Sequence, residues 1–190
     1  MKKTRFLLFV FLIVSNYGWS QQKNNHQLNF KNSVEFTIES SSNSINPLIK
    51  KINTLLNDGD IDSLSMSEYY NCKSSLKANR EFILELVEVD DKINLKQKTI
   101  KYFESSEKIL EDFIRPVIIH LNKPNQNEIF DAEKLKEGLL LIQASFNDTS
   151  ELSNSLDEFC AKYKLSRRMS DFDKIDFSQK IEELKSKLKD

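Results

Sequence analysis

From residue 65 onward, apolar residues recur every three or four positions, with polar residues between them. This spacing puts apolar side chains on one face of an α-helix. Short connections between long amphipathic helices favour antiparallel neighbours. We therefore predict an all-α fold, an antiparallel up-and-down helical bundle with four main helices plus flanking N- and C-terminal helices. The main helices are expected at residues 66–89, 93–122, 129–147 and 150–164, and the flanking helices near 47–57 and 173–188.

Residues 129–164 allow two interpretations. The run Asp148-Thr149-Ser150-Glu151 has the spacing of a helix cap, as does Ser65-Met66-Ser67-Glu68 before the first main helix. It favours a break after Asn147. The apolar seam also continues almost regularly from Phe146 to Tyr163, which favours one unbroken helix. We expect the break.

The two cysteines, Cys72 and Cys160, depend on that choice. With a break, a rise of 1.5 Å per residue brings Cys160 to within about 6 Å of the height of Cys72. An unbroken helix separates the two thiols by about 30 Å along the bundle, too far for a bridge. We expect a disulfide between them. The alternative is two buried thiols that pack as small hydrophobes.

Residues 28–38 alternate between apolar and polar positions, most clearly at Val34, Phe36 and Ile38. Alternation is the pattern of a half-buried strand, but no other segment offers a partner strand. We therefore expect an extended arm packed on the bundle, and pairing with a strand of another chain is the alternative. Residues 39–44 are rich in serine and predict a linker. The predicted organisation is a flexible leader and arm at 21–44 and a helical bundle domain at 45–190.

Residues 1–20 have the features of a secretory signal peptide. Three basic residues precede an apolar run of nine residues, Phe6–Val14, and small residues stand before a cut between Ser20 and Gln21. The run is about half as long as a membrane-spanning helix requires. We therefore expect an exported mature chain, periplasmic or secreted, with no stable membrane insertion.

Charge and glycine content exclude several classes of function. Removing the predicted leader leaves 25 basic and 29 acidic residues, a net charge of −4. A mildly acidic chain lacks the concentrated basic face that nucleic acid requires. Only Gly59 and Gly138 follow the leader, too few for a glycine-rich phosphate loop.

Candidate chemistry is sparse. A zinc site would have to combine His120 with the two distant cysteines. Haem ligation by His120 with Met66 or Met169 is equally weak, and a di-iron site is excluded because Val117 stands where a Glu-x-x-His motif needs glutamate. Carboxylate pairs are explained by a solvated helix face (Glu85 with Glu88, Glu104 with Glu107, Glu107 with Glu111). Pro116 either bends its helix or kinks it around a pocket beside His120. We assign no catalytic, cofactor-binding or metal-binding residue.

The sequence thus favours an exported interaction or structural module that binds a protein or cell-envelope component without catalysis, including inhibitor or immunity-type roles. The alternative is a carrier that holds a small apolar ligand or haem in the bundle core. Five aromatic residues would line such a pocket: Phe103, Phe113, Phe146, Phe159 and Tyr163.

Overall fold

The structure is a computed structural model of the chain, and it describes residues 25–48, 51, 65–122 and 132–168. Its regular elements are all helices, so the all-α prediction is confirmed for this part of the chain. They are an N-terminal helix at residues 25–48, α2 (Met66–Glu85), α3 (Leu95–Ile109), a π-helical turn η1 (Leu110–Ile114), α4 (Arg115–Leu121) and α5 (Ala132–Tyr163). The predicted signal peptide at residues 1–20 lies outside the described residues, as do all of the predicted flanking helix at 173–188 and most of the one near 47–57.

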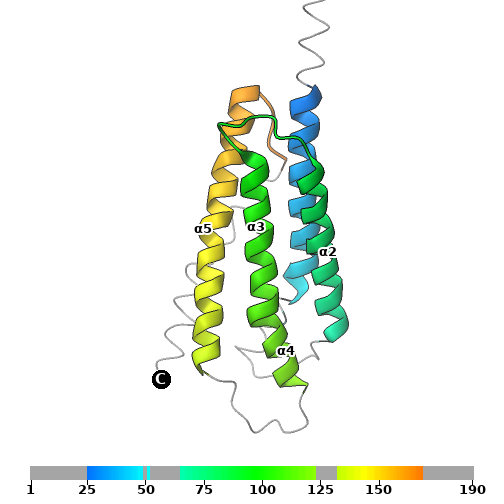
Figure 1. Cartoon of the computed structure of the whole chain (residues 1–190), viewed down its shortest axis with the longest axis vertical. Helices are drawn as coiled ribbons and strands as arrows, with labels where there is room; N and C mark the ends of the chain where they lie inside the picture. Colours follow the sequence, from blue (N-terminus) through cyan, green and yellow to red (C-terminus); the bar gives the residue numbers. More distant parts are fainter. Residues whose placement is uncertain (1–24, 49–50, 52–64, 123–131, 169–190) are drawn as a thin grey trace, which may run out of the picture.

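These helices lie side by side and alternate in direction (Figure 1). The N-terminal helix descends in this view, α2 ascends, α3 descends through η1 into α4, and α5 ascends. We call the end that holds the α2–α3 loop and the end of α5 the upper end. The N-terminal helix, α2, the rod of α3, η1 and α4, and α5 therefore alternate in direction. α2 and this rod lie at two of the predicted main helices (66–89 and 93–122), whereas α5 replaces the other two and the N-terminal helix was not predicted.

The predicted extended arm at 28–38 is wrong, because these residues form the middle of the N-terminal helix. Phe30, Val34 and Ile38 are buried at a spacing of four residues, whereas Phe36 is 61% exposed. The strand pattern and the helical pattern share the three buried residues. These residues form a helix because Lys31 and Glu35, which share the buried helical face with them, are also buried and pair with each other.

The serine-rich stretch at 39–44 is likewise helical, not a linker. Its small side chains pack against α2: Asn79 Nδ2 donates to Ser41 Oγ at 2.8 Å, and Ser44 Oγ donates to Ser75 Oγ at 3.0 Å. Lower down, Lys51 pairs with Glu68 at 2.6 Å. These contacts fix the register of the two helices.

Two features of α2 agree with the sequence. The Ser65–Glu68 capping box is present, with Glu68 N donating to Ser65 Oγ at 3.3 Å and Ser65 N to Glu68 Oε2 at 3.2 Å. The predicted seam is buried at Tyr69, Cys72, Leu76 and Ile83. The helix ends at Glu85, four residues before the predicted end.

The predicted break after Asn147 is also wrong, because α5 is one helix from Ala132 to Tyr163. Asp148 does not cap a new helix. Its carboxylate instead pairs with Lys101 of α3 at 2.8 Å and accepts a hydrogen bond from Ser105 of the same helix. The α5 seam continues into the core at Leu152, Leu156 and Phe159.

The state of the two cysteines is a consequence of the unbroken helix. Cys72 and Cys160 are both free and both buried, so the predicted disulfide is not formed. The physical reason is the one that the sequence offered as the alternative, namely that a continuous α5 carries Cys160 to the upper end, about 30 Å from Cys72 along the bundle.

Pro116 follows a wider turn of helix. In η1, the amide of Arg115 donates to Leu110 O, the i to i+5 bond of a π-helix. Proline has no amide hydrogen and crowds the carbonyl four residues earlier, so an ordinary turn here would be strained. Phe113 of this turn packs against Gly138 of α5, where a Cβ would overlap the Phe113 ring. Glycine at this position therefore lets η1 approach the α5 backbone.

Candidate interaction surface

A buried ion pair joins the N-terminal helix to the chain that leaves α5. Lys31 Nζ lies 2.8 Å from Glu35 Oε2, and the two side chains are only 3% and 1% exposed. Lys31 Nζ also donates to Ser166 O at 2.7 Å, and Arg168 N donates to Glu35 Oε1 at 2.9 Å. Both charges thus have partners, which buried charges require. The pair holds residues 166–168 against the N-terminal helix.

The chain reverses direction just after α5. Lys164 adopts a left-handed conformation with φ 54°, and Leu165 N donates to Cys160 O at 2.9 Å. Arg167 then reaches back to α5, where it donates to Ser153 Oγ at 2.9 Å and to Asp157 Oδ1 at 2.7 Å. Residues 165–168 therefore run back down the bundle.

A second polar junction ties the α2–α3 loop to the end of α5. Asp90 pairs with Lys162, and its Oδ2 accepts a hydrogen bond from Tyr163 Oη at 2.9 Å. The hydrogen bond from Lys162 is the largest influence on this carboxyl, and its pKa is lowered to about 2. Glu88 organises the same loop by accepting from the amides of Val89 and Lys96. These carboxylates therefore fasten the upper end together.

The residues considered for a zinc site lie at different ends of the bundle. Among the described residues, no group of three or more histidine, cysteine, aspartate or glutamate side chains is arranged to hold a metal ion. His120 is half-buried in α4, near the lower end of the bundle, whereas Cys160 lies at the upper end (Figure 1). Met169 lies outside the described residues. The structure thus separates His120 from Cys160, whereas Met66 begins α2 at the same lower end as His120.

Neither thiol is activated as a nucleophile. Burial raises the pKa of Cys72 to about 12. Burial also raises the pKa of Cys160, although Lys31 and Arg167 act in the opposite direction. Because the thiolate is the reactive form, both groups are in their unreactive state near neutral pH.

Two carboxylates of the pairs at helical spacing, Glu107 and Glu111, have basic partners on α2. Glu107 pairs with Arg80 at 2.8 Å, and Glu111 pairs with Lys73. Partial burial raises the pKa of Glu111, but hydrogen bonds from Lys73 and Tyr69 outweigh it, and the net pKa is lowered. These acidic residues of α3 and η1 fix α2 in place.

Three of the aromatic residues considered for a carrier pocket are buried against other side chains. The Phe159 ring lies 5.7 Å from the Phe30 ring and 4.7 Å from the Tyr163 ring, measured between centroids. Phe103 lies 5.3 Å from Tyr102, and Phe113 packs on Gly138. The contacts of these rings are those of a packed helical core.

The feature that sequence reasoning missed is a set of exposed apolar side chains at the upper part of the N-terminal helix, α2 and the start of the α2–α3 loop. Phe36 is 61% exposed, Phe82 44%, Leu84 46% and Val87 73%. The pairing of Ser41 with Asn79 puts Phe36 at the height of residues 83–84 of α2. We call these four residues the upper apolar set. The one sequence signal for it is that Phe82 and Leu84 fall outside the α2 seam.

Comparisons with known proteins give no relative, since the chain matches no protein-family model, no curated protein and no solved structure. Within the described ranges, none of the helices has both the length and the apolar character needed to cross a membrane.

Proposed function

We propose that this protein is an exported helical-bundle module that acts by binding a protein or cell-envelope component, without catalysis and without a cofactor. The observation that carries the proposal is the upper apolar set. Exposed apolar side chains concentrated in one part of a molecule mark interaction sites; here Phe36, Phe82 and Leu84 lie at one height of two packed helices, on more than one face of α2, and Val87 follows in the loop. Burying such a side chain stabilises a complex by about 1.5–3 kcal/mol relative to leaving it exposed.

The positions of the polar residues support a binding role over a catalytic one. The buried Lys31–Glu35 pair and the Asp90 carboxylate are each engaged by residues of other segments. Both groups hold helices together. We therefore assign the function to the solvent-exposed surface of the bundle.

Export is part of the same proposal. It rests on the leader pattern at residues 1–20, and the described residues begin at 25, beyond the expected cut between Ser20 and Gln21. Processing there would leave every described helix intact. The intact mass of the protein recovered from outside the cytoplasm should correspond to a chain that begins at Gln21. A chain that retains Met1 would contradict export.

Site-specific photocrosslinking in the native cells tests the binding role. We would introduce a photoreactive phenylalanine analogue separately at Phe36, Phe82 and Val87. Matched controls go at Gln97 and Glu104, which are exposed on α3. The proposal predicts one discrete crosslinked product from the three test positions and none from the controls. Its identity, read by mass spectrometry, should stay the same across the three positions.

Two results would contradict this function. The first is equal crosslinking from test and control positions, or none from either. The second is a small molecule that accompanies the native protein in a mass spectrum and leaves on denaturation, which would instead identify a carrier.

A further inference from the structure

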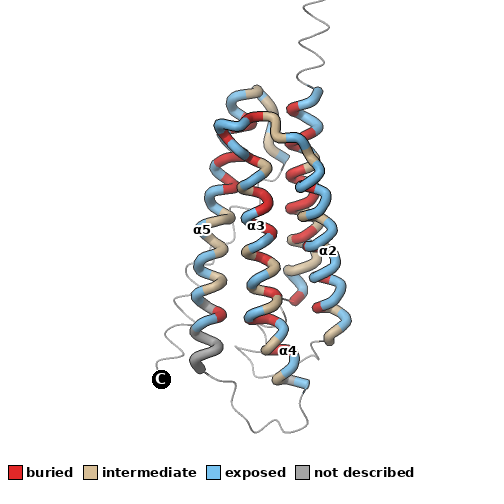
Figure 2. Tube along the Cα trace, in the orientation of Figure 1, coloured by how far each residue is buried: buried red, intermediate tan, exposed pale blue. Residues whose placement is uncertain are grey.

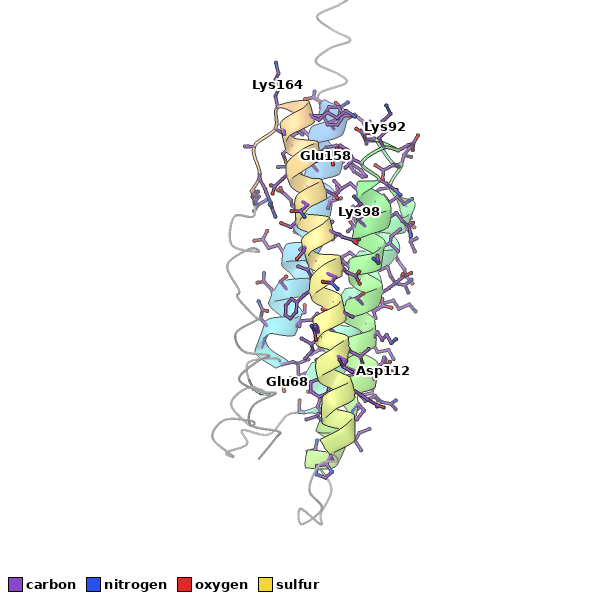
Figure 3. All side chains as sticks on the ribbon, turned by 90° about the vertical axis from the view of Figure 1, so that its left-hand side faces the viewer. Glu68, Lys92, Lys98, Asp112, Glu158 and Lys164 are labelled. Carbon is purple, nitrogen blue, oxygen red and sulfur yellow. The ribbon has the colours of Figure 1, made fainter. Side chains whose placement is uncertain are left out.

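The N-terminal helix presents a nearly uncharged face to solvent. Figure 2 shows buried and exposed positions alternating along it, as expected of a helix with one face in the core. At residues 25–48, no exposed position holds lysine, arginine, aspartate or glutamate (Asn25, His26, Leu28, Asn29, Asn32, Phe36, Asn43, Asn46, Pro47). On α3, three of the four exposed positions are charged, at Lys101, Glu104 and Lys108. In Figure 3, α3 lies on the other side of α5 from the lower part of the N-terminal helix, and Lys98 and Asp112 are labelled on the α3–η1 side.

Helix formation does not account for this composition. Asparagine is a poorer helix former than lysine, glutamate or glutamine, which normally fill a solvated helix face. A surface that is depleted of charge and carries an aromatic side chain is instead typical of the central part of a protein–protein interface. Phe36, which is 61% exposed, supplies the aromatic side chain here.

The outward-facing residues follow one line along the helix. Their spacing alternates between four and three residues, as in helices that pack along a common seam. We call these residues the outer seam: Asn25, Asn29, Asn32, Phe36, Glu39, Asn43 and Asn46. Glu39 is its only charged member, and its carboxylate lies 3.9 Å from Arg168 Nη2. The outer seam is therefore continuous along the helix and close to neutral.

The outer seam is self-complementary about Phe36. Asn29 and Asn43 each lie seven residues from Phe36, and Asn32 and Ser40 each lie four residues from it. A two-fold axis through Phe36, perpendicular to the helix, therefore places Asn29 opposite Asn43 of a second copy, as an isologous interface requires. A side-chain amide both donates and accepts hydrogen bonds, so two asparagines can satisfy each other.

The charge of the outer seam selects this antiparallel arrangement over a parallel one. In a parallel pair in the same register, Glu39 would face Glu39 of the second copy, and the two like charges would repel each other. About the two-fold axis at Phe36, Glu39 lies opposite Ser33 instead. A second copy in the antiparallel arrangement therefore meets no like charge along the seam.

We propose that two copies of this chain associate through the outer seams of their N-terminal helices, antiparallel, with Phe36 on the two-fold axis. The inference rests on the proposed function for the role of Phe36 in binding, and it names a second copy as the protein bound. Phe82 lies at nearly the height of Phe36, so the helix of the second copy also passes this residue. The single product expected from photocrosslinking is then a dimer of the chain.

Cysteine crosslinking tests the orientation and the register together. In a full chain with Cys72→Ala and Cys160→Ala, Asn29→Cys and Asn43→Cys are introduced separately. Under mild oxidation, their equimolar mixture should form a disulfide-linked dimer at least tenfold faster than either variant alone. The reason is that the two copies of residue 29 lie about 21 Å apart along the antiparallel pair, too far to bridge. A matched control mixes Gln97→Cys with Glu104→Cys, both exposed on α3.

Two crosslinking results would overturn the arrangement. The first is rapid bridging of Asn29→Cys alone, which requires a parallel pair. The second is an equal rate in the test and control mixtures, which indicates random collision.

Sedimentation equilibrium tests the association without any engineered cysteine. The average mass of the purified protein should rise from one chain toward two with concentration. Phe36→Glu should raise the dissociation constant at least tenfold, because two like charges then meet on the axis. Gln97→Glu adds the same charge on α3 and should change the constant less than twofold. The mass of a single chain at every concentration would overturn the proposal.

The two proposals fail separately. A monomer whose Phe82 and Val87 positions crosslink a different protein in the cells overturns the dimer and leaves the proposed function intact. A purified dimer whose photoreactive positions capture nothing in the cells overturns the proposed function alone.

Discussion

The two ends of the bundle are held by different forces. At the upper end, polar groups far apart in the sequence close the structure, as in Lys31 with Ser166 and Asp90 with Tyr163. Toward the lower end, η1 approaches α5 through an apolar contact between Phe113 and Gly138. The upper end of α5 is therefore held by polar bonds and its lower half is in apolar contact with η1, while the pairs of Lys51 with Glu68 and of Lys73 with Glu111 hold the lower part of α2. Each prediction below tests one side of this difference.

The largest effect is expected at the buried pair of the upper end. Lys31→Ala removes the ion-pair partner of Glu35 and leaves a carboxylate that is 1% exposed. Breaking a buried pair in this way should lower the free energy of unfolding by about 3–5 kcal/mol, measured by urea denaturation. The matched control is Lys77→Ala, whose pair with Glu81 is mostly exposed and should cost less than about 1 kcal/mol. Equal costs would contradict the structural role of the pair.

The lower end should be most sensitive at Gly138. Replacing an exposed glycine of a helix by alanine stabilises the helix by about 1 kcal/mol. Gly138→Ala should instead destabilise by about 1–3 kcal/mol, because the new methyl group overlaps the Phe113 ring. The double variant with Phe113→Leu should lose less than the two single costs added together, in the same urea measurement. A stabilising Gly138→Ala would show that η1 does not approach α5 closely.

A smaller, pH-dependent effect is expected at Asp90. Its folded-state pKa of about 2 lies below the ordinary value of 3.8, so its contribution to stability is present above pH 4 and is lost as the pH falls toward 2. The difference in unfolding free energy between the wild type and Asp90→Asn should be largest at pH 5–7 and should shrink below pH 4. A difference that is constant from pH 6 to pH 2 would mean that Asp90 is not held as an anion by Lys162.

The smallest effect concerns the two thiols. The native intact mass should show no loss of 2 Da, and both cysteines should be alkylated rapidly only after denaturation, since each is buried. Cys160 is 6% exposed and Cys72 1%, so Cys160 should react first during partial opening. A native bridge, found by peptide mapping, would require α5 to break where the sequence suggested.

The sequence was most informative where helices bury an ordinary apolar seam. Tyr69, Cys72 and Ile83 in α2, and Ile100, Phe103 and Leu110 in the next helical rod, are buried as their spacing predicts. These residues are enough to predict the all-α class, because apolar residues spaced three or four positions apart indicate amphipathic helices.

Prediction from the sequence failed where a helix buries polar residues. In the N-terminal helix, Lys31 and Glu35 are inside because Ser166 and Arg168, more than 130 residues away, supply their partners. In the sequence alone, Lys31 and Glu35 look like solvent-exposed residues, so the buried face of the helix is not recognised. The remaining apolar residues then show the alternation that is typical of a strand. The break predicted at Asp148 failed for a similar reason, since its carboxylate pairs with α3.

The candidate surface was missed for the same physical cause. The exposure of Phe36 and Phe82 depends on which neighbours cover each face, and spacing within one helix does not define those neighbours. Recognising the N-terminal helix as part of the bundle is what puts these side chains on an outer surface.

Hydrogen exchange of the N-terminal helix, followed by mass spectrometry on the full chain, tests the account most directly. The amides of residues 30–41 should exchange as slowly as those of α3, because a buried helix of the bundle opens only with the whole fold. Exchange of these amides within seconds, while α3 stays protected, would show an arm outside the core and would contradict the account.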